Sequence, residues 1–246
     1  RQMCIRDRSG TIDFTGSGSQ GDLICSNTSA NTFGSLDDAA GTVTFDATTI
    51  AQAIPAETFF NLKHSNPNNL TMSGNATVNG ELNFNVAAVL HTYANTLTIG
   101  INGSIANAAD DRHIDVTNTS GYLAKTFGSA TDFSYPVGNG TILRPIKLTT
   151  NAGSTTFKLR YDDNRYSSGN VTGGGFASGH ISGFDGSNTD VTKGYYYDIQ
   201  KTSGSANAKI YVNWTSEDDY GCLLYTSDAA DDSLRVDLGG RRIIKK

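Results

Sequence analysis

The sequence predicts an all-β protein, with a short parallel β-helix, or solenoid, followed by an antiparallel β-sandwich. Three observations predict this fold class. The chain is rich in Gly (27 residues), Asn and Thr, whereas Glu occurs only at positions 57, 81 and 217, so strong helix formers are scarce. Short alternating strands recur at a fixed spacing in the first half. Longer alternating strands, separated by Gly-, Ser- and Asn-rich loops, follow in the second half.

The two ends of the chain, residues 1–8 and 222–246, differ in composition from everything between them. Written back into codons, "MCIRD" (3–7) and "CLLYTS" (222–227) can be the two strands of one DNA element. That element resembles the transposase mosaic end of sequencing-library adapters, and residues 236–246 resemble the rest of such an adapter. We therefore expect both ends to be adapter-derived artefacts without a role in the fold, and the remainder to be a fragment of a longer natural protein.

Composition excludes several classes of function for the remaining chain. The two ends contain eight of the 19 Lys and Arg residues but only five of the 24 Asp and Glu residues, so the rest is more acidic than the overall net charge of −5. An acidic surface repels phosphate backbones, so no nucleic-acid partner is expected. No apolar run is long enough for a membrane span. Cys25 alone remains, which excludes an internal disulfide framework and a cysteine metal site.

Residues 9–118 are expected to form the solenoid. The strand-like triplets "VTF", "LTM" and "LTI" begin at Val43, Leu70 and Leu97, with a constant spacing of 27 residues. A fixed period of short strands with polar corners is typical of a solenoid, and alternation within each triplet gives one buried face. We therefore predict coils of about 27 residues in which Leu70 stacks on Leu97. An antiparallel sandwich with evenly spaced strands is the alternative.

Residues 119–221 are expected to form a sandwich-like module. A strand should end at Tyr135, a turn should run from Pro136 to Thr141, and a second strand should begin at Ile142. Three further segments alternate as half-buried strands do: "TTFKLRYDD" (155–163), "GYYYDIQK" (194–201) and "KIYVNW" (209–214).

These segments resemble a family of large secreted surface proteins of Bacteroidota. The resemblance lies in "NLTMSGNATVNGELNF" (69–84), "SGYLAKTF" (120–127) and "FSYPVGNGTILRPIKLT" (133–149), and it covers most of residues 41–215. In that family a segment of the form "FPVG…YRPV" follows a solenoid and opens a sandwich-like module. The resemblance implies export, often by a type IX route with a C-terminal sorting domain, and an extracellular or cell-surface location. Its motifs concern architecture and not chemistry.

Oxygen-rich loops are the candidate metal ligands. "YDDN" (161–164) and "FDGSNTD" (184–190) offer the hard oxygen ligands that calcium prefers, although neither matches an EF-hand loop. The candidate calcium ligands are therefore Asp162, Asp163, Asp185 and Asp190. No other cofactor is expected.

Other motifs favour structural roles. "GSGSQG" (16–21) has the glycine spacing of a dinucleotide-binding turn, but no helix pattern follows it, so a flexible turn is favoured. The four histidines have no zinc-site spacing. Adjacent acids in a strand point to opposite faces and cannot form a glycosidase pair by themselves; such pairs stand at 110–111, 162–163 and 218–219. The aromatic residues at 195–197 and Trp214 could stack on sugars, but core packing is favoured.

The sequence therefore favours a non-enzymatic, extracellular structural or adhesive segment of a bacterial surface protein, with glycans or surface proteins as partners. Two alternatives remain, a polysaccharide-active β-helix enzyme and a carbohydrate-binding module. An enzyme needs convergent acidic and basic side chains along one face, and Lys63 and Arg112 are the only basic residues between 41 and 118.

Overall fold

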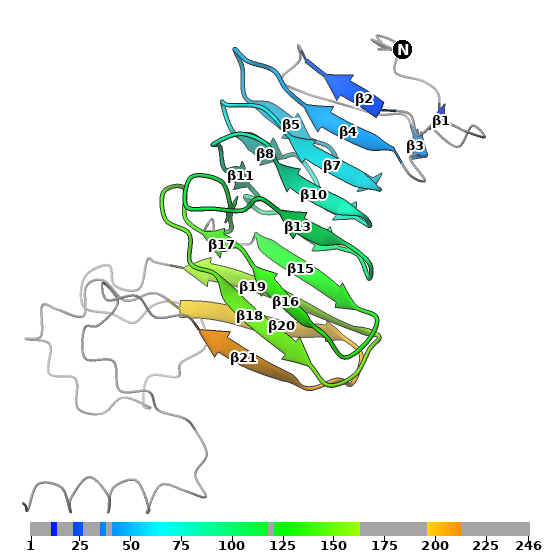
Figure 1. Cartoon of the computed structure of the whole chain (residues 1–246), viewed down its shortest axis with the longest axis vertical. Coiled ribbons are helices and arrows are strands. Elements are labelled where there is room, and N and C mark those ends of the chain that lie inside the picture. The colour runs from blue at the N-terminus through cyan, green and yellow to red at the C-terminus, as the bar shows by residue number, and fades with distance from the viewer. Residues whose placement is uncertain are drawn as a thin grey trace, which may run out of the picture. The chain divides into compact units, whose positions relative to one another are not determined.

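The structure, a computed structural model, describes residues 11–13, 22–26, 35–37, 41–117, 121–162 and 196–212. Within these ranges all regular secondary structure is β, and no helix occurs. Parallel strands form a solenoid, and antiparallel strands follow it (Figure 1). The all-β class and the parallel solenoid predicted from the sequence are therefore confirmed. A separate short parallel pair is formed by β1 (Thr11–Asp13) and β3 (Ser35–Asp37).

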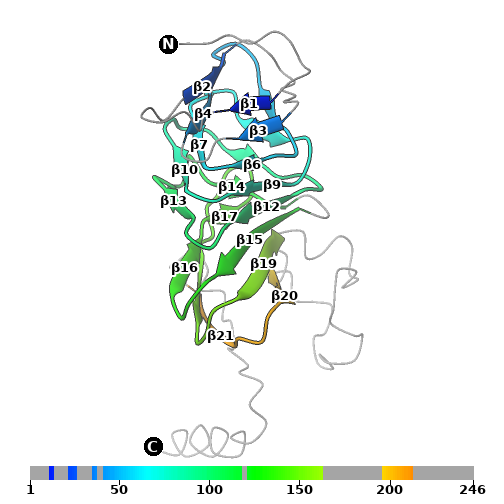
Figure 2. The same ribbon diagram turned by 90° about the vertical axis from the view of Figure 1, so that its right-hand side faces the viewer.

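Three sheets form the sides of the solenoid, and each coil from β4 to β15 contributes one strand to each side. Sheet 1 contains β2 (Asp22–Cys25), β4 (Thr42–Phe45), β7 (Asn61–His64), β10 (Glu81–Phe84) and β13 (Ser104–Ala106). Sheet 2 contains β5 (Gln52–Ile54), β8 (Leu70–Met72), β11 (Leu90–His91), β14 (Ile114–Asp115) and β17 (Val137–Gly138). Sheet 3 begins with the parallel strands β6 (Thr58–Phe59), β9 (Ala76–Val78), β12 (Thr96–Ile99) and β15 (Tyr122–Phe127) (Figure 2).

The strand register shows that the predicted constant period is wrong. Parallel partners in successive coils are unequally spaced along the chain, and every pair is closer in sequence than the predicted period. Leu70, for example, pairs with Leu90 in sheet 2. From one triplet to the next, the chain therefore completes one full coil and then continues to the next side of the solenoid. The three triplets accordingly lie in three different sheets, at Val43 in sheet 1, Leu70 in sheet 2 and Leu97 in sheet 3. Leu97 accordingly stacks on Ala76 in sheet 3 and not on Leu70.

The core of the solenoid is built from alternate residues of every strand. Strands of four residues such as β4, β10 and β12 bury their second and fourth side chains and turn the other two outward. The buried side chains form continuous columns through successive coils, because parallel strands in register place identical positions above one another. One such column in sheet 1 contains Leu23, Val43, Leu62 and Leu82. Removal of this apolar surface from water is the main force that holds the coils together.

Asparagine and aspartate side chains connect neighbouring coils at the corners. In each case a side-chain oxygen accepts a hydrogen bond from a backbone N–H of the next coil. The pairs are Asp22 with Thr42, Asn61 with Glu81, Asn69 with Val89, and Asn75 with Thr96, at 2.8–3.1 Å. Backbone groups at corners have no partner in a β-ladder, so these contacts satisfy donors that would otherwise be lost. The abundance of Asn in the sequence thus has a structural cause.

Antiparallel strands follow the solenoid and continue sheet 3. β15 pairs with β19 (Thr155–Asp162), and β19 pairs with β20 (Tyr196–Ser203). A separate sheet 4 contains β16 (Asp132–Tyr135), β18 (Ile146–Thr150) and β21 (Ala208–Val212). Aromatic side chains from both sheets meet edge to face, with ring centroids 4.9–6.5 Å apart; they are Phe127, Phe133, Tyr135 and Phe157. The Tyr135 hydroxyl donates to the Phe157 carbonyl oxygen (3.1 Å).

The parallel pairing extends past residue 118, where the sequence suggested a boundary. β15 pairs in parallel with β12, and β17 pairs in parallel with β14. The predicted turn from Pro136 to Thr141 therefore begins with a strand of sheet 2, and the next strand begins at Ile146 instead of Ile142. Strand β17 was missed because it is very short and follows a proline. The terminal segments 1–8 and 222–246 lie outside the described residues.

Candidate functional site on the outer face of sheet 2

A histidine and an aspartate lie next to each other on the outer face of sheet 2. His91 and Asp115 are register partners on β11 and β14, and the neighbouring residues Leu90 and Ile114 point into the core. Strand alternation therefore turns His91 and Asp115 to the opposite face. The His91 Nδ1 atom lies 2.7 Å from Asp115 Oδ2, and the two side chains are 20% and 9% exposed.

The Asp115 carboxylate is fully engaged. Its second oxygen, Oδ1, accepts hydrogen bonds from the backbone N–H (2.9 Å) and the hydroxyl (2.6 Å) of Thr117. Burial raises the pKa of Asp115, but the hydrogen bonds from His91 and Thr117 outweigh burial and hold the pKa below its usual value. An ionised Asp115 accepts a hydrogen bond from a proton-bearing Nδ1 of His91, so Nε2 of the neutral imidazole is left as an acceptor.

Tyr93 lies beside this pair at the corner that follows β11. Its ring is nearly parallel to the His91 ring, with an interplanar angle of 22° and centroids 5.8 Å apart. The side chain is 43% exposed. Its backbone φ of +50° lies in the left-handed region, which is rare for a bulky residue. A hydrogen bond from the Asn95 N–H to the Thr92 carbonyl (3.0 Å) closes the corner.

The segment after β17 passes over the pair. A Cβ atom placed on Gly140 would lie 3.7 Å from His91 Cε1 and 3.8 Å from Asp115 Oδ2. The Asn139 side chain shapes this segment, because its Oδ1 accepts hydrogen bonds from the N–H groups of Thr141 (2.9 Å) and Ile142 (2.7 Å). The outer face of sheet 2 therefore contains a site in which neighbouring groups hold the side chains in place.

The chemistry of this site is hydrogen bonding and stacking. Among the described residues, no hydroxyl or thiol is hydrogen-bonded to His91, whereas nucleophilic catalysis requires a nucleophile within reach of its base. The same residues contain no group of three His, Cys, Asp or Glu side chains that could hold a metal ion. An oriented imidazole beside an exposed aromatic ring is suited to binding a polar ligand with an apolar face.

His64 differs from His91 because it belongs to the core. Its side chain is fully buried in the inward column of sheet 1, between Phe45 and Phe84. Its Nε2 atom lies 3.4 Å from the Val89 carbonyl oxygen. Burial lowers the pKa of His64 to about 4, because the charged imidazolium would lose its hydration.

We expect His64 to destabilise the fold in acid. Below about pH 6.5 the unfolded chain binds a proton on this residue that the folded chain does not bind, so stability should fall until about pH 4 and then level off. The total loss should be about 3 kcal/mol. Urea denaturation between pH 4 and 7 measures it. His64→Phe should remove this part of the pH dependence, and an unchanged slope in the variant would contradict the assignment.

The structure places only part of the predicted calcium site. Asp162 ends β19, where it pairs with Tyr196 of β20. Asp163, Asp185 and Asp190 lie outside the described residues, as do the "GSGSQG" motif, His180, Tyr195 and Trp214. Tyr197 packs against the core, and its hydroxyl donates to the Arg144 carbonyl oxygen (3.1 Å). The core role expected for the tyrosine cluster is therefore confirmed for Tyr197.

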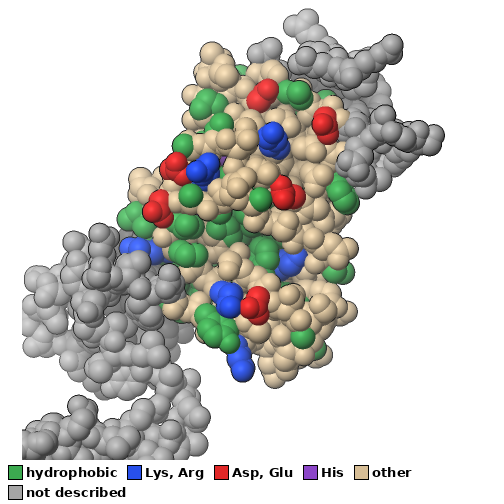
Figure 3. Space-filling view, viewed as in Figure 1, with side chains coloured by type: hydrophobic (Ala, Val, Ile, Leu, Met, Phe, Trp, Pro, Cys, Tyr) green, Lys and Arg blue, Asp and Glu red, His purple; other side chains and the backbone are tan. Residues whose placement is uncertain are grey.

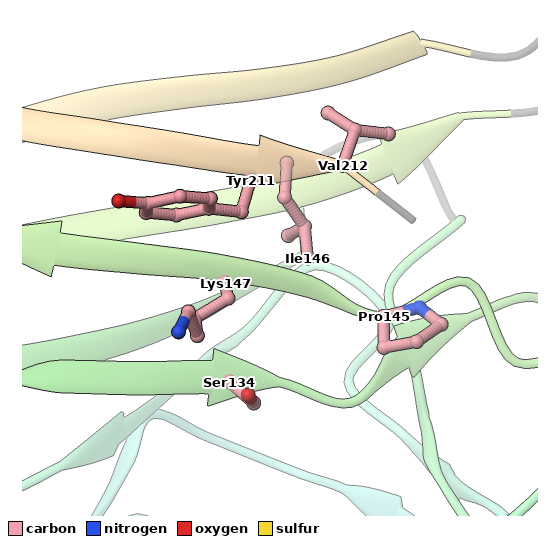
Figure 4. A pocket seen from close by; sticks show the side chains of 6 residues that line it. All are labelled: Ser134, Pro145, Ile146, Lys147, Tyr211 and Val212. Atoms are coloured by element: carbon pink, nitrogen blue, oxygen red, sulfur yellow. The ribbon is translucent and has the colours of Figure 1, made fainter. Parts of the chain in front are cut away.

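A hollow of about 270 Å³ lies beside sheet 4. It is lined by Ser134, Pro145, Ile146, Lys147, Tyr211 and Val212 (Figure 4). In it, Lys147 Nζ is 4.9 Å from the Tyr211 ring centroid and 2.9 Å from Asp132 Oδ2. The ammonium group is therefore already engaged by a carboxylate and an aromatic ring.

A polar cluster lies on the outer face of sheet 3, across β15, β19 and β20. The Tyr122 hydroxyl donates to Asp198 Oδ2 (2.8 Å), and Arg160 Nη2 lies 3.4 Å from the same oxygen. Lys158 Nζ lies 4.0 Å from the Tyr122 ring centroid, and the Gln200 amide donates to Asp198. These contacts hold three antiparallel strands together, so the cluster has a structural function.

Sequence reasoning missed the pair of His91 and Asp115. The separation of the two residues in sequence equals the length of the coil at that point, because they are register partners in successive coils. The period predicted from the triplets is longer than this separation, so it did not place the two residues next to each other. The true length of this coil would have placed them side by side.

Comparison of the chain with protein-family models, with curated proteins and with solved structures gave no match. The geometry therefore defines the chain as a β-solenoid protein with a histidine–aspartate–tyrosine site on one outer face. In the part of the chain that the structure describes, no helix has the length and apolarity to cross a membrane.

Proposed function

We propose that the chain is a structural and adhesive segment of a secreted surface protein of the Bacteroidota type. The observation on which this rests is the set of continuous buried columns through the parallel sheets. From β4 to β15, each coil is bonded to the next by three β-ladders and by side chains at the corners, so it cannot bend independently of its neighbours. Such a structure serves as a stiff spacer that holds binding surfaces away from a cell.

The antiparallel strands supply the end of this spacer. We propose that β15, β19 and β20 face sheet 4 as a small sandwich-like module, with the aromatic cluster of Phe127, Phe133 and Phe157 between them. Export by a type IX route and a cell-surface location are part of the proposal, and they rest on the resemblance of residues 69–84 and 133–149 to Bacteroidota surface proteins.

The composition of the outer surface favours partners that are recognised through uncharged polar groups. On the face shown in Figure 3, acidic and basic side chains are scattered among uncharged ones. Recognition of nucleic acid would require a continuous basic track. We therefore propose glycans or surface proteins as partners, and not nucleic acid.

One observation favours a second candidate, a polysaccharide-active enzyme. A carboxylate that orients an imidazole is found in many general-base catalysts, and His91 with Asp115 has this geometry at 2.7 Å. The structural and adhesive role is preferred because the described residues place no nucleophile and no second carboxylate against His91.

Assays of the full chain on a panel of insoluble and soluble polysaccharides separate the two candidates. Pull-down should show retention on some of them, and reducing-end and unsaturated-product assays should show no turnover. Turnover that disappears in His91→Ala would replace the structural and adhesive role with the enzymatic one. A chain that is neither retained nor active would contradict the adhesive part of the proposal.

A further inference from the structure

Tyr93 is an exposed aromatic ring in a fixed position. Its side chain is 43% exposed, although burial would stabilise so large an apolar surface. The contact with the His91 ring, 5.8 Å between centroids, restricts its rotation. His91 is in turn held by Asp115, and Asp115 by Thr117. The orientation of the Tyr93 ring is therefore set by a chain of contacts before any ligand arrives.

The backbone at Tyr93 is strained and pinned. A φ of +50° costs free energy for a tyrosine, and such outliers persist where the surroundings enforce them and are concentrated at functional sites. At Tyr93 the surroundings include Gly121 of the next coil, whose backbone approaches this corner closely. A Cβ atom there would collide with the Tyr93 carbonyl oxygen and with the Thr92 hydroxyl. The close approach of glycine thus fixes the corner that presents the ring.

His91 supplies a hydrogen-bonding group next to this ring. Its Nδ1 is bonded to Asp115, and among the described residues its Nε2 has no hydrogen-bond partner. Because the carboxylate selects the tautomer, Nε2 of the neutral ring accepts a hydrogen bond and does not donate one.

We propose that Tyr93 and His91 bind a neutral sugar residue of a glycan. The C–H face of the sugar ring stacks on the exposed Tyr93 ring, and a sugar hydroxyl donates a hydrogen bond to His91 Nε2. The assignment rests on the proposed adhesive function and names the ligand class and the site for it. Both protein groups are held in place beforehand, so little conformational entropy is lost on binding.

Charge selects neutral sugars over acidic ones. Among the described residues that form the site, the ionised group is the Asp115 carboxylate, which repels a uronate or a sulfate. Arg160 and Lys158, which could attract an anionic sugar, are on sheet 3 and are engaged with Asp198 and Tyr122.

Isothermal titration of the full chain with cellohexaose, xylohexaose, mannohexaose, laminarihexaose and hexagalacturonate tests the assignment. At least one neutral hexasaccharide should bind, and the hexagalacturonate should not. Tyr93→Asn should weaken binding about tenfold or more, because it removes the stacking surface. Asparagine tolerates a positive φ, so this variant retains the corner. Tyr93→Phe should bind as the unchanged chain does.

Tyr211→Asn is the matched control, because Tyr211 is similarly exposed (49%) but stands beside Lys147 on sheet 4. It should leave binding unchanged. Absence of binding by every neutral hexasaccharide, or binding that Tyr93→Asn leaves intact, would overturn the assignment. If a neutral hexasaccharide binds equally well to Tyr93→Asn, the adhesive function would stand, but its binding site would lie elsewhere. Polysaccharide turnover would instead overturn the adhesive function itself, whatever the effect of Tyr93→Asn.

Discussion

Leu97→Asp should prevent the solenoid from folding stably. Leu97 is fully buried at the centre of sheet 3, where it stacks between Ala76 of β9 and Leu123 of β15. The strand neighbours of Leu97 are apolar, so an aspartate there would lose its hydration and its carboxylate would cost several kcal/mol whether it is ionised or takes up a proton. That cost is a large part of the ~5–15 kcal/mol by which a domain is stable. Thermal denaturation followed by circular dichroism should show a fall of at least ~10 °C or the loss of a cooperative transition.

Thr98→Asp is the matched control, one residue further along the same strand. Thr98 stands between Thr77 and Ala124 on the outward face of sheet 3, where water can solvate a carboxylate. The midpoint of its transition should stay within ~2 °C of the parent chain. Equal loss in both variants would mean that the two faces of β12 are not distinguished by burial, which would contradict the solenoid.

Lys125→Met should destabilise the chain by about 3 kcal/mol. Lys125 lies on β15 and is 4% exposed. Its ammonium group donates to three carbonyl oxygens at the corner after β12, those of Gly100 (2.5 Å), Ile101 (3.1 Å) and Gly103 (2.7 Å). Methionine matches the length of the side chain but donates no hydrogen bond, so buried carbonyl groups would lose their charged partner. Urea denaturation at pH 7 measures the difference.

Lys147→Met provides the comparison, because it makes the same substitution at an exposed lysine of sheet 4. Lys147 forms an ion pair with Asp132, in which both side chains are about half exposed. Surface ion pairs of this kind add little to stability, so the variant should unfold at the urea concentration of the parent. A larger effect at Lys147 than at Lys125 would show that the corner carbonyls do not depend on the ammonium group.

The fold class could be predicted because strand alternation is a local property. Each of the three triplets at Val43, Leu70 and Leu97 buries the residues that the pattern assigned to the inside. The coil length could not be predicted from the same triplets. All three sheets have the same inward–outward pattern, so a triplet of one sheet resembles a triplet of the next in sequence. Because the coils differ in length, the sequence also has no constant period that would show which triplets belong to the same sheet.

The candidate site could not be predicted, because it depends on which residues of different coils are neighbours. His91 and Asp115 meet only when the length of their own coil is known, and the strain at Tyr93 is a property of the backbone that no sequence pattern reports. The calcium hypothesis used local composition alone, and of its four residues only Asp162 lies in the described range. The calcium hypothesis therefore stays a prediction.

The unequal coil lengths have a consequence for how such a chain can change during evolution. The coil that leads from Gln52 to its partner Leu70 is shorter than the coil that leads from Thr96 to Tyr122, yet the buried columns continue without interruption. The extra residues are therefore accommodated at corners. A single insertion within a strand would turn every following side chain of that strand to the opposite face. Corners can thus gain loops, and with them new binding surfaces, while the strands accept substitutions but not changes of length.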